Sequence, residues 1–378
     1  MRAMLAKADL ARYAGQFVWL ELSYDNERNR AFLTKYGAHA TPTFFIVDSR
    51  DQRVAATQTG AMSFTELTQF LNRGESVALA RRQTHADAAL TRGDALLSKQ
   101  PSEAAKAYNE AIHLAPPNWP QRELVEASFV GALENSKQFQ ECAETAATDA
   151  VHMKQDSMFA RTVVAGMWCL DSGDPAPWST DEARRLEPLA EKALALPGTV
   201  RDERDALYRT LMYLSFARND SAEASKWGDR WLKELDAVKP VDDDERTAVD
   251  IARVENVQVY GDPARILPDL LKSEREMPKN YNASLRVAQM EEAVQHYDEA
   301  IAACNRGLTR SPGALGRSWL LQVKADALVQ LGKPVEARLV LEEGLQAAQA
   351  IPQKSSRENN IAAIKNTLLK LGGASTKH

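Results

Sequence analysis

The stretch GDALLSKQPSEAAKAYNEAIHLAP, residues 93–116, has the pattern of two short helices that pack against each other. Small residues at the contact positions let antiparallel helices approach closely, an aromatic side chain fills the seam, and a proline ends the second helix. These positions are Gly93, Leu96, Ala104, Tyr108, Ala111 and Pro116. The stretch therefore predicts a helical hairpin.

The same pattern recurs twice near the C-terminus. One unit has Ala288, Tyr297, Ala300, Cys304, Gly307 and Pro312, and the unit directly after it has Ala325, Leu328, Pro334, Ala337, Leu341 and Gly344. This set of positions is similar to the tetratricopeptide (TPR) pattern, although the first unit is one residue short between its helices. Between these units the pattern is weaker. We expect six or seven helix pairs in all, followed by a single capping helix over residues 356–371.

The TPR resemblance implies an all-α solenoid over residues 76–378. Such arrays bury a continuous core between neighbouring helix pairs and present a concave groove that binds an extended segment or a helix of another protein. A protein or peptide partner in this groove is therefore the expected ligand. The alternative is that the helices only pack on the N-terminal region and support it.

Composition disfavours several other classes of protein. The chain has 378 residues, 44% of them hydrophobic and 26% charged, with a formal net charge of -5. Acidic and basic residues are mixed along the chain, which makes nucleic acid a poor candidate partner. No apolar run is long enough to span a bilayer, so the sequence predicts a soluble protein that is not transmembrane. It leaves the compartment open.

The first 75 residues follow a different pattern. Helices are expected over residues 1–13, 26–36 and 63–71, the last opened by a serine cap with a glutamate three residues later. Apolar runs predict buried strands over residues 17–22 and 43–47, and a further strand is expected over residues 53–59. We place a domain boundary after residue 75, because a helix is predicted to end on Gly74. The expected domains are therefore 1–75 and 76–378.

The segment Tyr36-Gly37-Ala38-His39-Ala40-Thr41-Pro42-Thr43 resembles the approach to the active-site strand in thioredoxin. The resemblance extends through the strand at Phe44 and the terminal helix, so it covers about two-thirds of a thioredoxin-like domain. In that family the proline is cis, and the residue before it pairs with a bound peptide. The resemblance therefore implies that Thr41 and Pro42 bind substrate. The alternative is that the proline only shapes a turn.

The chain lacks the Cys-x-x-Cys pair with which a thioredoxin attacks disulfides. It begins at a segment that resembles the residues directly after that pair in bacterial thioredoxin family proteins. The family's central first strand, which lies between the strands matched to residues 17–22 and 43–47, is also absent. The fold class expected is thus an α/β thioredoxin-like partial domain followed by an all-α TPR-like solenoid. We expect Met1 to be an internal residue of a longer natural protein.

Other residues are interpreted as structural. Cys142, Cys169 and Cys304 are widely spaced and lie in helical runs, so we expect buried, inert thiols and neither a disulfide framework nor a zinc site. Trp227 and Trp231 lie one turn apart and are expected to fill a helix seam. The acidic run 242–245 is expected to begin a helix in solvent. His39 is a lone loop histidine and weak evidence for catalysis. No metal or cofactor is expected, and no catalytic residue.

Two functions follow. In the first, the full-length form is a thioredoxin-family protein that exchanges thiols and disulfides on protein substrates, while the solenoid selects the partner. The chain as given would then be inactive as an enzyme, because it lacks the redox cysteines. In the second, the protein is a non-catalytic interaction scaffold.

Overall fold

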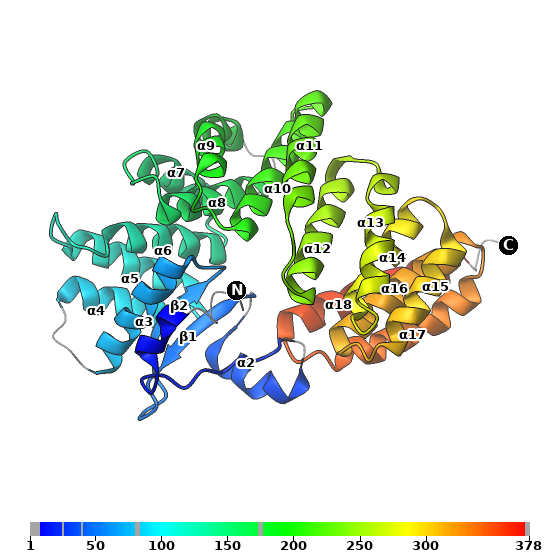
Figure 1. The fold of residues 1–378 in the computed structure, drawn as a ribbon, viewed down its shortest axis with the longest axis horizontal. Helices are drawn as coiled ribbons and strands as arrows, with labels where there is room; N and C mark the ends of the chain where they lie inside the picture. The colour runs from blue at the N-terminus through cyan, green and yellow to red at the C-terminus, as the bar shows by residue number, and fades with distance from the viewer. Residues whose placement is uncertain (1–7, 25, 39–40, 80–83, 173–176, 375–378) are drawn as a thin grey trace. The chain divides into compact units, whose positions relative to one another are not determined.

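In a computed structural model, the chain folds into two compact units (Figure 1). The first comprises residues 1–20 and 36–224, and the second comprises residues 21–35 and 225–378. The structure describes every residue except 1–7, 25, 39–40, 80–83, 173–176 and 375–378. Each unit contains residues from both sides of position 75. The first unit continues past it to residue 224, and the second combines the short segment 21–35 with the C-terminal helices.

The first unit is built mainly of helices in sequential pairs. They are α4 (His85–Leu97), α5 (Pro101–Leu114), α6 (Arg122–Asn135), α7 (Phe139–Asp149), α8 (Ser157–Ser172), α9 (Pro177–Ala195) and α10 (Arg201–Ala217). The helical hairpin predicted from residues 93–116 is confirmed as α4 and α5. Ala104, Tyr108 and Ala111 are completely buried, and Gly93 lies directly against the Tyr108 ring. The glycine is required because any side chain there would occupy the position of the ring.

The second unit continues with helices of the same kind. They are α11 (Ser221–Ala237), which begins within the first unit, α12 (Asp243–Tyr260), α13 (Leu267–Glu276), α14 (Tyr281–Ala293), α15 (Tyr297–Thr309), α16 (Ala314–Gln330), α17 (Pro334–Gln349) and α18 (Lys354–Ala374), with a short 3-10 helix η3 (Pro263–Arg265). The two C-terminal hairpins are confirmed as α14–α15 and α16–α17. In α18, Ile364 is buried against Leu341 and Leu328, so α18 closes this core as a capping helix does.

A segment from near the N-terminus contacts the end of this second unit. It contains the 3-10 helix η2 (Glu27–Asn29) and α2 (Arg30–Tyr36), which ends at Gly37 as expected. The hydroxyl groups of Tyr24 and Ser356 lie 3.5 Å apart, and Arg30 donates a hydrogen bond of 3.4 Å to the carbonyl oxygen of Ala350. Polar contacts therefore hold this segment to the residue that follows α17 and to the first turn of α18.

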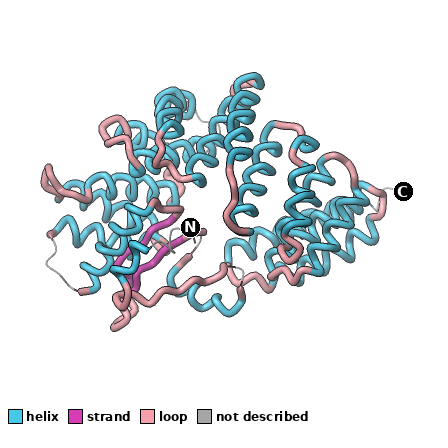
Figure 2. The backbone as a smooth tube through the Cα atoms, viewed as in Figure 1, coloured by secondary structure: helices cyan, strands magenta, loops and turns pink. Residues whose placement is uncertain are grey.

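Within the first unit, residues 8–20 and 43–78 form a small layered body that we call the hairpin module. It consists of the 3-10 helix η1 (Ala8–Tyr13), strands β1 (Thr43–Val47) and β2 (Val54–Thr59), and α3 (Phe64–Ala78). The strands pair antiparallel, with Thr43 opposite Thr59, and α3 covers them (Figure 2). The predicted cap of α3 is confirmed: Ser63 and Glu66 exchange side chain to backbone hydrogen bonds. A core around Leu67 and Phe70 holds the layers together.

The expected strand over residues 17–22 is wrong. These residues have no strand structure, and Val18 and Leu20 are 88% and 74% exposed. The sheet in the described residues contains β1 and β2 alone, so the segment around Trp19 shares no sheet with Phe45. Without a neighbouring strand its backbone has no ladder to join. The thioredoxin-like part of the predicted fold class is therefore not supported by the sheet.

Two further expectations near the N-terminus differ from the structure. The helix expected over residues 1–13 is a 3-10 helix over 8–13, and residues 1–7 lie outside the described part. Gly74 does not end α3, which continues to Ala78. A Cβ atom at Gly74 would lie 2.2 Å from Cδ1 of Ile46, so this glycine permits close packing of α3 on β1.

Asp94 of α4 joins the hairpin module to the helices. It is 2% exposed, accepts a hydrogen bond of 2.9 Å from the Tyr108 hydroxyl, and lies 3.1 Å from the Arg73 guanidinium of α3 in an ion pair. The backbone N–H of Thr57 in β2 also donates to it. Burial raises the pKa of Asp94, against the opposing effects of Arg73 and Tyr108. One carboxylate thus contacts α3, β2 and α5.

A second buried cluster lies further along the array. Arg161 of α8 lies 2.8 Å from Glu66 Oε1 at the start of α3 and 3.7 Å from Glu203 Oε1 of α10, and donates a hydrogen bond of 2.8 Å to the carbonyl oxygen of Ala61. Two carboxylates thus share one guanidinium. Burial raises the pKa of Glu203 to about 7, although Arg161 lowers it.

Replacing Gly93 by alanine should destabilise the protein. The new methyl group would lie 2.4 Å from the Tyr108 ring, and such overpacking costs about 1–3 kcal/mol. Gly131→Ala in α6 is the matched control, because a Cβ atom there meets no heavy atom within 4 Å. We expect the control to be neutral or slightly stabilising. Urea unfolding of both variants measures the difference, and equal stabilities would contradict this account of the seam.

Glu203 should make stability depend on pH near neutrality. Its pKa in the folded protein is about 7, above the ordinary value of 4.5, so the folded state binds this proton more tightly than the unfolded chain does. The free energy of unfolding should therefore rise as pH falls from 8 to 5, by an amount on the order of 2 kcal/mol from this group.

The variant Glu203→Gln should lose that part of the pH dependence while keeping an acceptor for the Val200 N–H. Unfolding curves measured from pH 5 to 8 test this. A variant with the same pH dependence as the wild type would refute the assignment.

Candidate functional site

Thr41 and Pro42 lie at the entry to β1. Their peptide bond is cis, Thr41 is exposed, and the carbonyl oxygen of Pro42 accepts a hydrogen bond of 2.9 Å from the N–H of Gly60. This bond extends the β1–β2 pairing by one step. His39 lies outside the described residues. A substrate-binding role for Thr41 and Pro42 stays a prediction, since the geometry around them also suits a simple turn.

The cysteines differ from the expectation of three separate thiols. Cys142 of α7 and Cys169 of α8 form a disulfide with a Cα–Cα distance of 6.2 Å, and both are completely buried. The two cysteines lie on successive helices, and successive helices are neighbours in a helical array, so their order along the chain is compatible with the pairing.

Cys304 is confirmed as a buried thiol. Burial raises its pKa to about 12, so it is protonated at neutral pH and a poor nucleophile. Together with the buried disulfide, this leaves no exposed cysteine pair among the described residues. They also contain no group of three or more His, Cys, Asp or Glu side chains placed to hold a metal ion.

The remaining structural interpretations hold. Trp227 and Trp231 are buried on α11, and Asp242 caps α12 by accepting a hydrogen bond from the N–H of Glu245. Ser284 is buried and donates a hydrogen bond to Glu274. In the part of the chain that the structure describes, no helix is both long enough and apolar enough to cross a bilayer.

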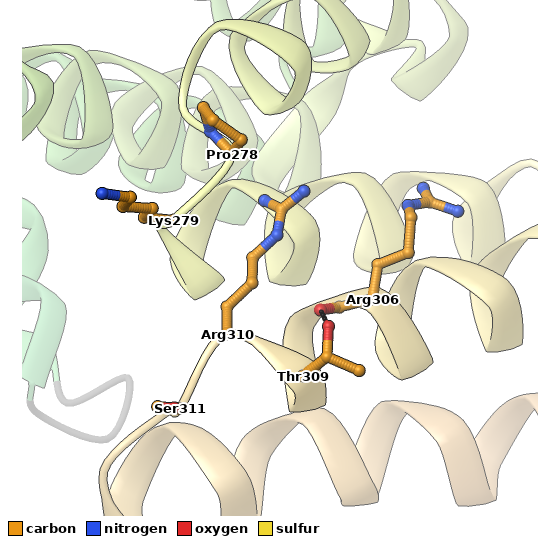
Figure 3. Close-up of a pocket in the computed structure, with 6 residues that line it drawn as sticks. All are labelled: Pro278, Lys279, Arg306, Thr309, Arg310 and Ser311. Carbon is orange, nitrogen blue, oxygen red and sulfur yellow. Dashed lines mark hydrogen bonds between the residues drawn. The ribbon is translucent and has the colours of Figure 1, made fainter.

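A hollow of about 610 Å³ on the second unit gathers basic side chains (Figure 3). We call it the basic hollow. The loop between α13 and α14 and the C-terminal end of α15 supply its lining, which consists of Pro278, Lys279, Arg306, Thr309, Arg310 and Ser311. Thr309 is turned back, because its hydroxyl donates to the carbonyl oxygen of Arg306. The lining contains three cations and no carboxylate.

Glu274 holds the two arginines in place from behind the lining. It accepts hydrogen bonds from Arg306 Nε at 3.0 Å and from an Arg306 terminal nitrogen at 2.8 Å, and Arg310 lies 3.6 Å away. Arg310 also donates to the carbonyl oxygens of Met277 and Asn280. Burial opposes ionisation of Glu274, but the bonds from Arg306 and Ser284 outweigh it and keep its pKa below the ordinary value.

The lining of the basic hollow contains three cations, whose charge the buried Glu274 offsets in part, and Glu291 also lies close enough to raise the pKa of Arg306. Lys279 is exposed, and Arg306 is about half exposed, so both present charge to solvent. The six lining residues include no general base and no activated nucleophile. The arrangement is thus suited to holding an anionic group.

Sequence reasoning missed this hollow. The signal was slight: Arg306 and Arg310 are one helical turn apart, and Lys279 follows a proline in a loop. Each of these is common on solvated surfaces. The arginines are positioned by Glu274, which accepts hydrogen bonds from Arg306. These two residues are 32 positions apart in the sequence, so local pattern does not reveal the contact.

Comparisons with known proteins give fold likeness only. No protein-family model matches the chain, and no curated protein matches it. One similar solved structure is a tetratricopeptide repeat protein from Parabacteroides merdae ATCC 43184, with a TM-score of 0.48, 13% identity, and coverage of 76% of this chain and 98% of that one. Another is the TPR2AB domain of yeast Sti1 with pHSP90, with a TM-score of 0.27, 14% identity and the same coverage. Both are TPR structures, and neither likeness assigns a function.

Thiol counting tests the cysteine assignment. Unfolding without reductant should release one reactive thiol per chain, from Cys304, and unfolding with reductant should release three. The folded protein should react slowly. Maleimide labelling followed by mass spectrometry measures all three states, and three thiols without reductant would refute the bridge.

The double variant Cys142→Ala/Cys169→Ala should lose about 2–4 kcal/mol of stability, since the bridge closes a loop with a sequence separation of 27. Reductant should lower the stability of the wild type and leave that of the double variant unchanged.

Proposed function

We propose that the protein is a non-catalytic protein-binding scaffold, and that the basic hollow contacts an acidic segment of its partner. The observation that carries this proposal is the group of three lining cations at the end of a helical hairpin, with Lys279 exposed and Arg306 about half exposed. Complementary charge accelerates association and selects among partners, even where it adds little to affinity.

The cations around Arg306 are already ordered in the free protein. Arg306 is held by two hydrogen bonds to Glu274, and Arg310 by two backbone carbonyl groups. An incoming acidic segment therefore does not have to immobilise these side chains, which removes part of the entropic cost of binding. Beneath them, α14, α15 and α16 pack directly on each other. The hollow is thus a rigid feature of the array.

Thiol–disulfide exchange is not part of this proposal. The described cysteines are a buried disulfide and a buried thiol whose pKa is raised to about 12. Neither supplies an accessible thiolate at neutral pH. The scaffold function needs none, because a helical array binds its partners by shape and charge.

A charge-reversal experiment tests the scaffold proposal. A fluorescein-labelled hexaglutamate peptide should bind the full chain. The variant Lys279→Glu should raise the dissociation constant of the peptide about five- to tenfold, because it removes a cation and adds a repelling charge. Fluorescence anisotropy measures the binding. Raising the salt concentration should weaken the wild-type interaction, because the contact is exposed to solvent.

Lys365→Glu is the matched control, since it makes the same charge change at an exposed position of α18 away from the lining residues. Its affinity for the peptide should stay within about twofold of the wild type. A hexalysine peptide should not bind. If Lys279→Glu and Lys365→Glu weaken binding equally, the hollow has no special role and the proposal fails.

A further inference from the structure

Helix α7 is held in the first unit by small side chains. Its buried residues are Cys142, Ala143, Ala146 and Ala147, and its first residue, Phe139, is half-buried. The helix packs against α6, α8 and α9. An alanine methyl group removes little apolar area from water, and the stabilisation that packing gives is roughly proportional to that area. Apolar packing therefore holds α7 only weakly.

Other helices of the first unit have large buried side chains. In α8 they include Phe159 and Met167, and in α5 the ring of Tyr108 is completely buried. Helix α7 has a polar contact with α9, in which the hydroxyl group of Thr148 accepts a hydrogen bond of 3.1 Å from Arg185. Both side chains are exposed, so water competes for this bond and its net contribution is small. Helix α7 thus depends on a further contact in a way that α5 and α8 do not.

The Cys142–Cys169 bridge is that contact. It joins the first half of α7 to the last turn of α8. The two helices approach closely beside it, because a Cβ atom at Gly166 of α8 would lie 2.4 Å from Cβ of Ala146. Both cysteines are completely buried, so a reductant reaches the sulfur atoms only after the helices have separated locally. The bridge fixes α7, and the closed α7 in turn protects the bridge.

We propose that the Cys142–Cys169 bridge is a redox-sensitive fastening for α7. With the bridge formed, α7 is closed on α8 and the array of the first unit is continuous. With the bridge reduced, α7 opens locally while α4, α5 and the hairpin module stay folded. The bridge lies in the first unit, so this proposal does not depend on the basic hollow of the second unit.

The reductant of this device is a thiol of the glutathione class. Two such thiols supply two electrons and two protons, the Sγ–Sγ bond breaks, both cysteines become thiols, and the two donor molecules join as one disulfide. Disulfides persist in oxidising compartments, whereas thiols stay reduced in the cytosol. The closed array is therefore the form of the protein in an oxidising compartment.

Amide exchange of the oxidised and the reduced full chain, measured by mass spectrometry, tests the proposal. Reduced protein is prepared by unfolding in guanidinium with a phosphine reductant and refolding in its presence. It keeps both sulfur atoms, so the comparison isolates the covalent bond from the packing of the side chains. Exchange in α7 should rise on reduction, and the factor by which it rises should be at least about tenfold larger than the factor in α5.

Two cysteine variants serve as controls for the reductant. Cys304→Ala removes the free thiol of α15 and should show the same change in α7 on reduction as the wild type. In Cys142→Ala/Cys169→Ala, α7 should exchange rapidly with and without reductant, because no bridge is present to break.

Two glycine variants test whether α7 protects the bridge. In Gly166→Ala the new methyl group would meet Ala146 and separate α7 from α8, so dithiothreitol should reduce the bridge of the folded protein at least about fivefold faster than in the wild type. Gly131→Ala in α6 is the matched control, since a Cβ atom there meets no heavy atom within 4 Å, and its reduction rate should equal that of the wild type.

The proposal is overturned if α7 exchanges equally slowly in the oxidised and the reduced protein, because the bridge then does not hold the helix. It is equally overturned if exchange in α5 and α7 rises by the same factor, or if circular dichroism shows that the reduced chain does not fold. In both of these cases the bridge stabilises the unit as a whole. Equal rates of bridge reduction in Gly166→Ala and Gly131→Ala would show that α7 does not control access to the sulfur atoms, which also contradicts the proposal.

Discussion

The buried carboxylate of Asp94 is the contact on which the first unit most depends. It is almost inaccessible to water, so its charge and its oxygen atoms must be satisfied within the protein. Arg73 compensates the charge, and Tyr108 and the backbone of Thr57 donate hydrogen bonds, so the partners come from three different elements. The requirement brings α3, β2 and α5 to one point on α4, and it fixes where the hairpin module can lie. Loss of any one partner would leave a buried charge short of compensation.

The second unit uses a buried acid in a similar way. Glu274 compensates Arg306 and Arg310, but here the cations extend to the surface instead of closing the core. An ion pair between a buried carboxylate and an arginine therefore joins packed elements at Asp94, whereas near Glu274 it leaves positive charge exposed at the surface. That difference follows from position: Arg73 is nearly buried, whereas Arg306 is about half exposed.

Local pattern predicted the helical hairpins and the strands β1 and β2, but it failed for the apolar run around Trp19. Gly93, Ala104 and Tyr108 carry a repeat whose partners lie within a few turns of sequence, so their spacing is informative by itself. The apolar run around Trp19 has the composition of a strand, but a strand needs a neighbour to hydrogen-bond with. The described structure supplies none, and the run remains irregular and largely exposed. Gly74 was misread for a related reason, because its constraint is the distant side chain of Ile46.

The sequence by itself determined the succession of helices, their caps at Ser63 and Asp242, the β1 and β2 strands, and the small residues that let helices meet. These depend on contacts between residues close along the chain. The tertiary structure decided the Cys142–Cys169 bridge, the sharing of Arg161 between Glu66 and Glu203, and the basic hollow around Arg306. Each of these joins different helices, so it exists only once packing has set the distances between side chains and removed the water that would otherwise solvate their charges.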